Sequence, residues 1–203
     1  MPPTVIQNTH RQWHNDVAEE VTDPTTGAKV KQAFFEGKAV KELVKPNWPI
    51  YKFNDYPTLA AGPEPWRTLS PWWSPYDEHH HDGGWEARVR FAEHFGVSIR
   101  EMGRLTSVIK EGWNSLGYLL VIRLKQPVWG FWGTFKGMDR EAGPGSKMYT
   151  NENRPKNAPA DFRPELKGAY KGLTGSGGAS QFYIPGLRVM HVSSWTVTSL
   201  LNK

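Results

Sequence analysis

Residues 172–187 read GLTGSGGASQFYIPGL, a glycine-rich loop that runs directly into a strand-like segment beginning at Gln181. Glycine lets the backbone approach a ligand closely because it has no Cβ atom. A polar residue at the start of a strand can be aimed into a cleft, and Gln181 stands in that position. This stretch therefore predicts a β-strand with a ligand site at its beginning.

The segments around this stretch predict further strands. Residues 118–133, YLLVIRLKQPVWGFWG, are rich in Leu and β-branched residues and predict two strands or one long bent strand. QFYIPGLRVMHV and SWTVTSLL predict two more near the end of the chain. IYKF, residues 50–53, is the best strand candidate in the proline-rich part that spans residues 46–75.

Three stretches carry apolar residues at helical spacing. Residues 28–44, AKVKQAFFEGKAVKELV, predict a short helix. The residues expected to form its buried stripe are Ala33, Phe34, Val40, Leu43 and Val44. WEARVRFAEHF predicts a second helix that Gly96 ends. Ser98 and Glu101 form the Ser-x-x-Glu capping-box pattern, which predicts that a third helix begins there.

The order of these elements, with helices in the middle and strands clustered later, predicts an α+β fold rather than a doubly wound sheet. We expect an N-terminal helical extension over residues 1–45 and one further domain over residues 46–203. Residues 136–180 are rich in Gly, Pro, Asn and Lys without periodicity, which predicts a lid or a functional loop.

The composition excludes several classes of protein and of chemistry. The chain has 203 residues, 38% hydrophobic and 22% charged, which is unlike a disordered or membrane-spanning protein. The absence of Cys excludes disulfides, thiolate metal sites and Cys nucleophiles, and fits a reducing compartment. The net charge of +5 favours an anionic partner, although an ordinary basic surface explains it equally well. No apolar run approaches the roughly 18 residues that a membrane helix needs, so we expect no membrane insertion. The N-terminus lacks a basic region followed by an apolar run, so we expect secretion by a dedicated system.

The loop and strand at Gln181 resemble the catalytic strand of the ADP-ribosyltransferase superfamily, whose loop enters a strand with Glu or Gln. The pattern looks most like the tuberculosis necrotizing toxin type of NAD glycohydrolase, in which GGG-x-Q-aromatic precedes the last strands. Residues 118–133 are similar to the strand of those toxins that ends in a Pro-Val turn. IYKF and RTLSPWWS, residues 67–74, resemble a first strand with a basic residue and a strand with a Ser-centred motif.

The resemblance implies an ADP-ribosyltransferase-like split mixed or antiparallel β core with helices on one side. It implies a toxin or effector domain of interbacterial competition that consumes NAD in the cytoplasm of a target cell, with NAD as substrate and no metal. An acidic immunity protein that plugs the cleft is the expected partner. Lys52 stands where Arg is usual, and Ser-Gln replaces the acid-x-acid pair of protein-modifying transferases, which favours hydrolysis over transfer.

The resemblance also implies the site residues. The expected catalytic residues are Gln181, Arg67 and Ser70. The expected NAD-binding residues are Lys52, Tyr51, Trp72, Trp73, Gly178 and Phe182. Cleavage of the nicotinamide–ribose bond passes through an oxocarbenium-like transition state, so the pyrophosphate must be clamped, the nicotinamide stacked and the ribose hydroxyls held. Arg67 or Lys52 suits the phosphates, an aromatic ring suits the nicotinamide, and Gln181 suits the ribose or a water molecule.

Three other interpretations stay open. Transfer of ADP-ribose to a protein or nucleic acid acceptor needs a substrate-facing loop, for which residues 136–175 are the candidate. A non-enzymatic nucleic-acid-binding module fits the alternation of basic and aromatic residues over 85–104. A metal-dependent hydrolase centred on residues 79–81, three histidines between Glu78 and Asp82, ranks lowest. Adjacent side chains point apart in a strand and no helical i, i+4 pair is present, so the histidines predict a solvated loop.

Overall fold

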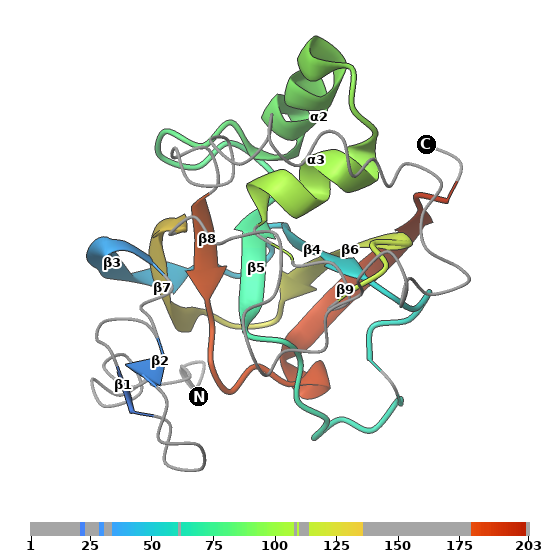
Figure 1. The fold of residues 1–203 in the computed structure, drawn as a ribbon. Helices are drawn as coiled ribbons and strands as arrows, with labels where there is room; N and C mark the ends of the chain where they lie inside the picture. Colours follow the sequence, from blue (N-terminus) through green and yellow to red (C-terminus); the bar gives the residue numbers. More distant parts are fainter. Residues whose placement is uncertain are drawn as a thin grey trace.

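The computed structural model describes residues 21–22, 29–30, 34–60, 62–107, 109, 114–135 and 180–201. A seven-stranded sheet has the order β3-β7-β8-β5-β4-β6-β9, and all six pairings in it are antiparallel (Figure 1). Its strands are β3 (Phe34–Val44), β4 (Ile50–Asn54), β5 (Trp72–Pro75), β6 (Tyr118–Leu124), β7 (Val128–Phe135), β8 (Ser180–Tyr183) and β9 (Val192–Ser199). The helices are α2 (Gly84–Phe95) and α3 (Ile99–Thr106), with a single 3-10 turn at Val189–His191. A separate ladder pairs β1 (Val21–Thr22) with β2 (Lys29–Val30). The predicted α+β class is confirmed.

The short strand β5 joins the two halves of the sheet. Its first two residues, Trp72 and Trp73, pair with β8, whereas Ser74 and Pro75 pair with β4 on the opposite edge. One half of the sheet therefore contains β3, β7 and β8, and the other contains β4, β6 and β9. In Figure 1, β8 and β5 run side by side, whereas β9 crosses the view at an angle to them.

The helices pack on the half of the sheet that contains β4 and β6. Tyr51 and Phe53 of β4 form one buried cluster with Met102 of α3 and Ala92 of α2. Figure 1 shows both helices on the same side of the strands. The second cluster includes Trp73 and has members in all seven strands. In the part of the chain that the structure describes, no helix is long and apolar enough to cross a membrane.

Helix α2 ends and helix α3 begins at the residues that the sequence predicts. Gly96 stops α2 in the left-handed conformation at φ 60°, which a glycine adopts without a Cβ clash. The Ser98 side chain accepts a hydrogen bond from the backbone amide of Glu101 at 3.1 Å and caps α3. The strands predicted at IYKF, YLLVIRL, VWGFWG, SQFY and in the last run are also present as β4, β6, β7, β8 and β9.

The helix predicted over residues 28–44 is wrong, because residues 34–44 form the edge strand β3. This strand pairs with β7 at Phe34 and again from Ala39 to Val44, with Val40 opposite Trp132 and Val44 opposite Val128. Val40 is 59% exposed whereas Val44 is fully buried, so the two residues do not share a buried helical stripe. An isolated helix of this length is marginal in water, and pairing with the free edge of β7 outweighs the helical periodicity.

Several other sequence expectations lie outside the described residues. They include Ala33, Gly178 and the loop over residues 136–179. The domain boundary expected after residue 45 comes directly after β3. This strand belongs to the same seven-stranded sheet as β4 to β9.

A substitution at Gly103 of α3 tests how closely this helix packs against β4. A Cβ atom at Gly103 would lie 2.5 Å from the Phe53 ring, which is 3% exposed and held between Tyr51 and Trp85. Overpacking costs about 1–3 kcal/mol, against the ~1 kcal/mol that Ala gains over Gly in a helix. We expect Gly103→Ala to lower the free energy of unfolding by about 1 kcal/mol in urea denaturation.

The same change in a Phe53→Leu background is the control. Without the ring, Gly103→Ala should be neutral or stabilising. Stabilisation in both backgrounds would show that α3 does not lie against Phe53.

Candidate functional site

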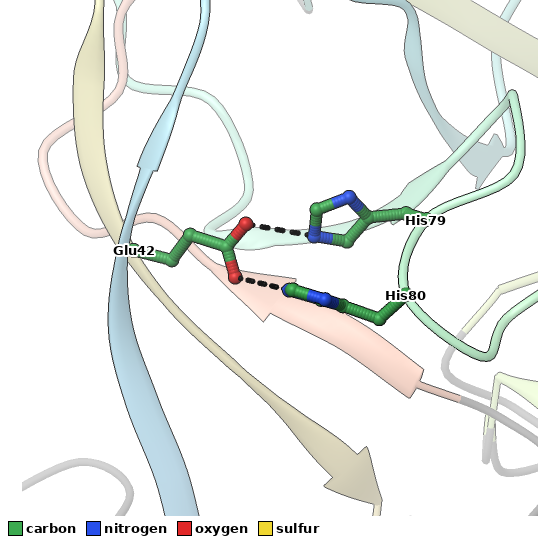
Figure 2. A group of neighbouring side chains, drawn as sticks. All are labelled: Glu42, His79 and His80. Carbon is green, nitrogen blue, oxygen red and sulfur yellow. Dashed lines mark hydrogen bonds and ion pairs between the residues drawn. The ribbon is translucent and has the colours of Figure 1, made fainter.

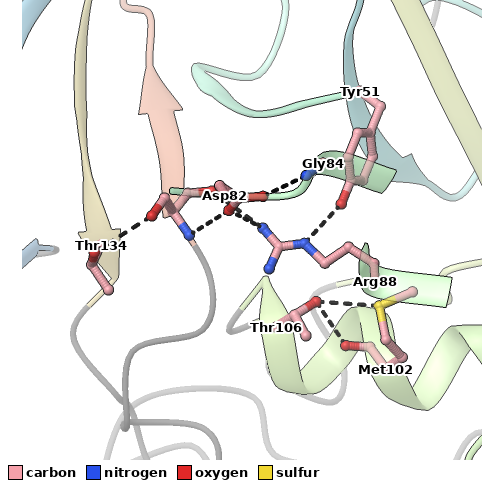
Figure 3. A network of polar contacts seen from close by, with 8 residues as sticks. Tyr51, Asp82, Gly84, Arg88, Met102, Thr106 and Thr134 are labelled. Atoms are coloured by element: carbon pink, nitrogen blue, oxygen red, sulfur yellow. Dashed lines mark hydrogen bonds and ion pairs between the residues drawn. The ribbon is translucent and has the colours of Figure 1, made fainter. Parts of the chain in front are cut away.

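A buried arginine stands at the junction of α2 and β8. Arg88 is 4% exposed, and its Nη2 donates to Asp82 Oδ2 at 2.9 Å (Figure 3). The same nitrogen approaches the carbonyl oxygen of Ser180 at 3.4 Å, and Nε donates to the Tyr51 hydroxyl at 3.2 Å. A buried charge is very unfavourable unless it is paired and hydrogen-bonded, and this network supplies both conditions.

Asp82 connects the same network to the start of β8. Its Oδ1 accepts from the backbone amide of Gly84 at 2.9 Å, and its Oδ2 accepts from the amide of Ser180 at 3.2 Å. Gly84 has φ +66°, and a Cβ atom there would meet the carbonyl oxygen of Tyr76 at 2.5 Å, so only glycine fits. Both backbone groups of Ser180 are therefore bound by the pair of Arg88 and Asp82.

The phenol of Tyr51 completes the network from β4. Burial raises the pKa of Tyr51 above its ordinary value of 10.0, although the adjacent Arg88 opposes this shift. Tyr51 therefore stays a neutral phenol at ordinary pH and accepts a hydrogen bond without adding charge. Its ring packs edge-on against Trp85 of α2 at 5.1 Å between centroids.

The structure makes neighbours of the three strands that carry most of the predicted site residues, because β8 pairs with β5 and β5 pairs with β4. Strand alternation divides these residues between two faces. We call one the Gln181 face; it carries Tyr51, Trp72, Gln181 and Tyr183. We call the other the Trp73 face; it carries Lys52, Trp73, Trp132 and Phe182.

On the Gln181 face, Gln181 lies one residue after Ser180 and is 4% exposed. It stands opposite Gly133 of β7, which has no side chain. Trp72 stands opposite Tyr183, with 4.6 Å between the ring centroids, and is only partly buried. A buried amide thus lies beside a pair of aromatic rings on one face of the sheet.

The Trp73 face is a packed core. Trp73 and Phe182 are both 0% exposed, so neither ring has surface to offer a ligand. Lys52 holds its Nζ 5.6 Å from the centroid of the Trp73 ring, and burial lowers the pKa of Lys52 below its ordinary 10.5.

Arg67 and Ser70 lie in the irregular segment before β5. Arg67 is exposed and forms an ion pair with Glu64 at 2.8 Å. Ser70 Oγ accepts a long hydrogen bond, 3.4 Å, from the amide of Trp72, and its carbonyl accepts from Trp73 Nε1 at 2.7 Å. Among the described residues, no contact links Arg67 to Gln181, so these two predicted catalytic residues are not brought together.

Sequence reasoning missed the network around Arg88. A signal was present, because Gly84, Arg88 and Ala92 are the buried positions of α2 and follow one another at intervals of four residues. An arginine between two small residues on one face of a helix indicates that this face is buried and that the arginine has an acidic partner there. Of the four arginines in residues 85–104, Arg90 alone is exposed, which fits packing on the core better than a nucleic-acid face.

A second polar cluster lies on the other side of the sheet. Glu42 of β3 contacts His79 at 2.8 Å and His80 at 3.0 Å (Figure 2). These residues have the nitrogen and oxygen donors that a divalent metal ion prefers.

No protein-family model matches the sequence, and neither a curated protein nor a solved structure matches it. The function is therefore inferred from the residues of the chain itself.

Removal of Arg88 should destabilise the fold strongly. Arg88→Met leaves Asp82 buried without its partner, so we expect the free energy of unfolding to fall by about 3–5 kcal/mol. Arg90→Met is the matched control on the same helix, because Arg90 pairs with Glu86 at 3.2 Å with both side chains largely exposed. That change should cost less than about 0.5 kcal/mol. Equal effects of the two substitutions in urea denaturation would contradict a buried ion pair.

Proposed function

We propose that this chain is a toxin or effector domain that consumes NAD by hydrolysing the nicotinamide–ribose bond. One observation carries the proposal: the three elements that resemble the ADP-ribosyltransferase site lie on adjacent strands β4, β5 and β8. A long segment of sequence separates β8 from β5. If the similarity of these short motifs were due to chance, the three strands that carry them would not be expected to be neighbours in the sheet.

The Gln181 face supports a specific assignment of roles. The Gln181 carboxamide both donates and accepts hydrogen bonds, which suits a ribose hydroxyl or a water molecule. Trp72 is the stacking residue for nicotinamide, because Trp73 and Phe182 are fully buried and Trp72 is not. Ser70 lies two residues before β5, and its hydroxyl accepts a hydrogen bond from the backbone amide of Trp72 at 3.4 Å.

Arg88 acts as a positioning residue in this account. Its guanidinium is bound to Asp82, so it does not serve as a free phosphate clamp. By holding the carbonyl of Ser180, it fixes the backbone immediately before Gln181. A site that is held rigidly in advance stabilises a transition state without reorganising during the reaction.

The reaction balances without a cofactor. The oxygen of a water molecule bonds to C1′ of the ribose, and the bond from C1′ to the nicotinamide nitrogen breaks. Nicotinamide leaves as a neutral molecule, ADP-ribose forms, and one proton of the water passes to solvent. Charge develops on the ribose in an oxocarbenium-like transition state, which preorganised dipoles stabilise.

The biological setting belongs to the same proposal. The domain reaches the cytoplasm of a target cell through a dedicated secretion system and consumes NAD there. Its net charge of +5 suits an acidic immunity protein that covers the Gln181 face.

The test follows NAD, nicotinamide and ADP-ribose over time with purified protein. The wild type should release nicotinamide and ADP-ribose in equal amounts. Gln181→Ala should lower kcat/KM by about 10²–10³, the usual effect of removing one group that stabilises the transition state. Trp72→Ala should also weaken turnover, whereas Trp66→Ala, which changes a tryptophan that is 67% exposed, should have little effect.

Each alternative gives a distinct result in this assay. Nicotinamide without matching ADP-ribose would replace hydrolysis with transfer to an acceptor. Full activity of Gln181→Ala in a protein with a wild-type circular dichroism spectrum would refute the assigned site. No loss of NAD, even with cell extract added, would refute the proposed function.

A further inference from the structure

One carboxylate faces two imidazole nitrogens at the edge of the sheet. Glu42 Oε1 lies 2.8 Å from His79 Nε2, and Glu42 Oε2 lies 3.0 Å from His80 Nε2 (Figure 2). The three ligand atoms all lie within 4.8 Å of one another. The residues come from separate elements, because Glu42 is on β3 whereas both histidines are in the loop between β5 and α2.

The backbone explains how two adjacent histidines converge. His80 has φ 51°, a left-handed conformation that is rare for a residue other than glycine. Residues His79 and Asp82 close a tight turn through two backbone hydrogen bonds, each 2.8 Å long. The alternation of side chains along a strand therefore does not apply here, and both rings turn toward Glu42.

The position of His79 is fixed by aromatic neighbours. Its ring lies 4.3 Å from that of Trp48, 4.7 Å from Trp132 and 5.3 Å from Phe182. Asp82, at the other end of the turn, is bound by Arg88. The donor atoms thus stand in a preorganised frame, which is what a specific metal site requires.

The contact of His79 Nε2 with Glu42 Oε1 is close but poorly aligned for a hydrogen bond. The nitrogen is buried and forms no hydrogen bond of acceptable geometry with the described residues. Buried polar atoms without a hydrogen bond are rare in folded proteins and call for another ligand. Bonds of about 2.0–2.1 Å to a tetrahedral zinc ion would separate two ligand atoms by roughly 3.3 Å. The observed separations of 2.8 and 3.0 Å need only a small opening to reach that value.

We propose that Glu42, His79 and His80 bind a divalent transition-metal ion, with Zn²⁺ the best match to two imidazoles and a carboxylate. The remaining coordination position is open to water on the side of His80, whose side chain is 52% exposed. The site lies with Phe182 on the Trp73 face, opposite Gln181. Its role is structural: the ion ties the edge strand β3 to the turn that carries Asp82.

The test titrates Zn²⁺ into the full chain after removal of metal with a chelator. Calorimetry should show one tight site per chain, and Zn²⁺ should raise the thermal midpoint. Glu42→Gln and His80→Asn should each weaken binding by at least about tenfold, since even residues behind the ligands affect affinity by 10- to 100-fold. Asn is chosen because it tolerates the left-handed backbone of His80.

His81→Asn is the matched control, because His81 is exposed in the same turn and lies outside the cluster. It should bind Zn²⁺ as the wild type does. Co²⁺ should give visible absorption bands that His80→Asn removes. The proposal is overturned if the wild type shows no saturable Zn²⁺ binding, or if Glu42→Gln and His80→Asn bind as tightly as the wild type.

A folding defect and loss of a ligand are distinguished by circular dichroism of the metal-free variants. His80 is half exposed, so His80→Asn should fold as the wild type does and by itself decides the outcome. Zn²⁺ binding is read by calorimetry and NAD cleavage by product release, in separate experiments on the same chain. The metal site and the proposed function therefore fail independently.

Discussion

The buried pair of Arg88 and Asp82 is the contact on which the rest of the site depends. It joins α2, the turn after β5 and the first residue of β8, three parts of the chain that are distant in sequence. Buried ion pairs contribute little net stability, because desolvation offsets their attraction, but the loss of one partner is strongly destabilising. We therefore interpret the pair as a device that specifies geometry. It determines where β8 begins and hence where Gln181 stands beside β5.

The alternation of side chains gives the sheet two faces with different contents. One face buries Trp73 and Phe182 completely, which gives part of the high Trp content a structural role. The other face presents Gln181 beside the partly buried ring of Trp72. The proposed metal site shares the packed face. The helices cover the Gln181 face around Tyr51 and Phe53, so the proposed NAD chemistry is assigned to the part of that face that β5 and β8 form.

Local patterns predicted much of the fold and only part of the site. Helix α3 follows from its cap at Ser98, and β4 and β6 follow from their β-branched runs, because these signals act within a few residues. The strand β3 was missed because its conformation depends on pairing with β7, which lies far along the chain. Arg88 was not singled out because its partners, Asp82, Tyr51 and Ser180, are brought to it only by the fold. The two histidines were set aside because neither strand alternation nor helical spacing brings adjacent side chains together, and no sequence pattern announced the left-handed backbone of His80.

Hydrogen exchange measured by mass spectrometry, with and without a hydrolysis-resistant NAD analogue, tests the central claim most directly. If NAD binds on the face defined by Gln181 and Trp72, exchange should slow in β5 and β8 and stay unchanged in β9, which lies at the far edge of the sheet. Slowing confined to other elements, or no slowing at saturating analogue, would contradict the claim that these strands form an NAD site.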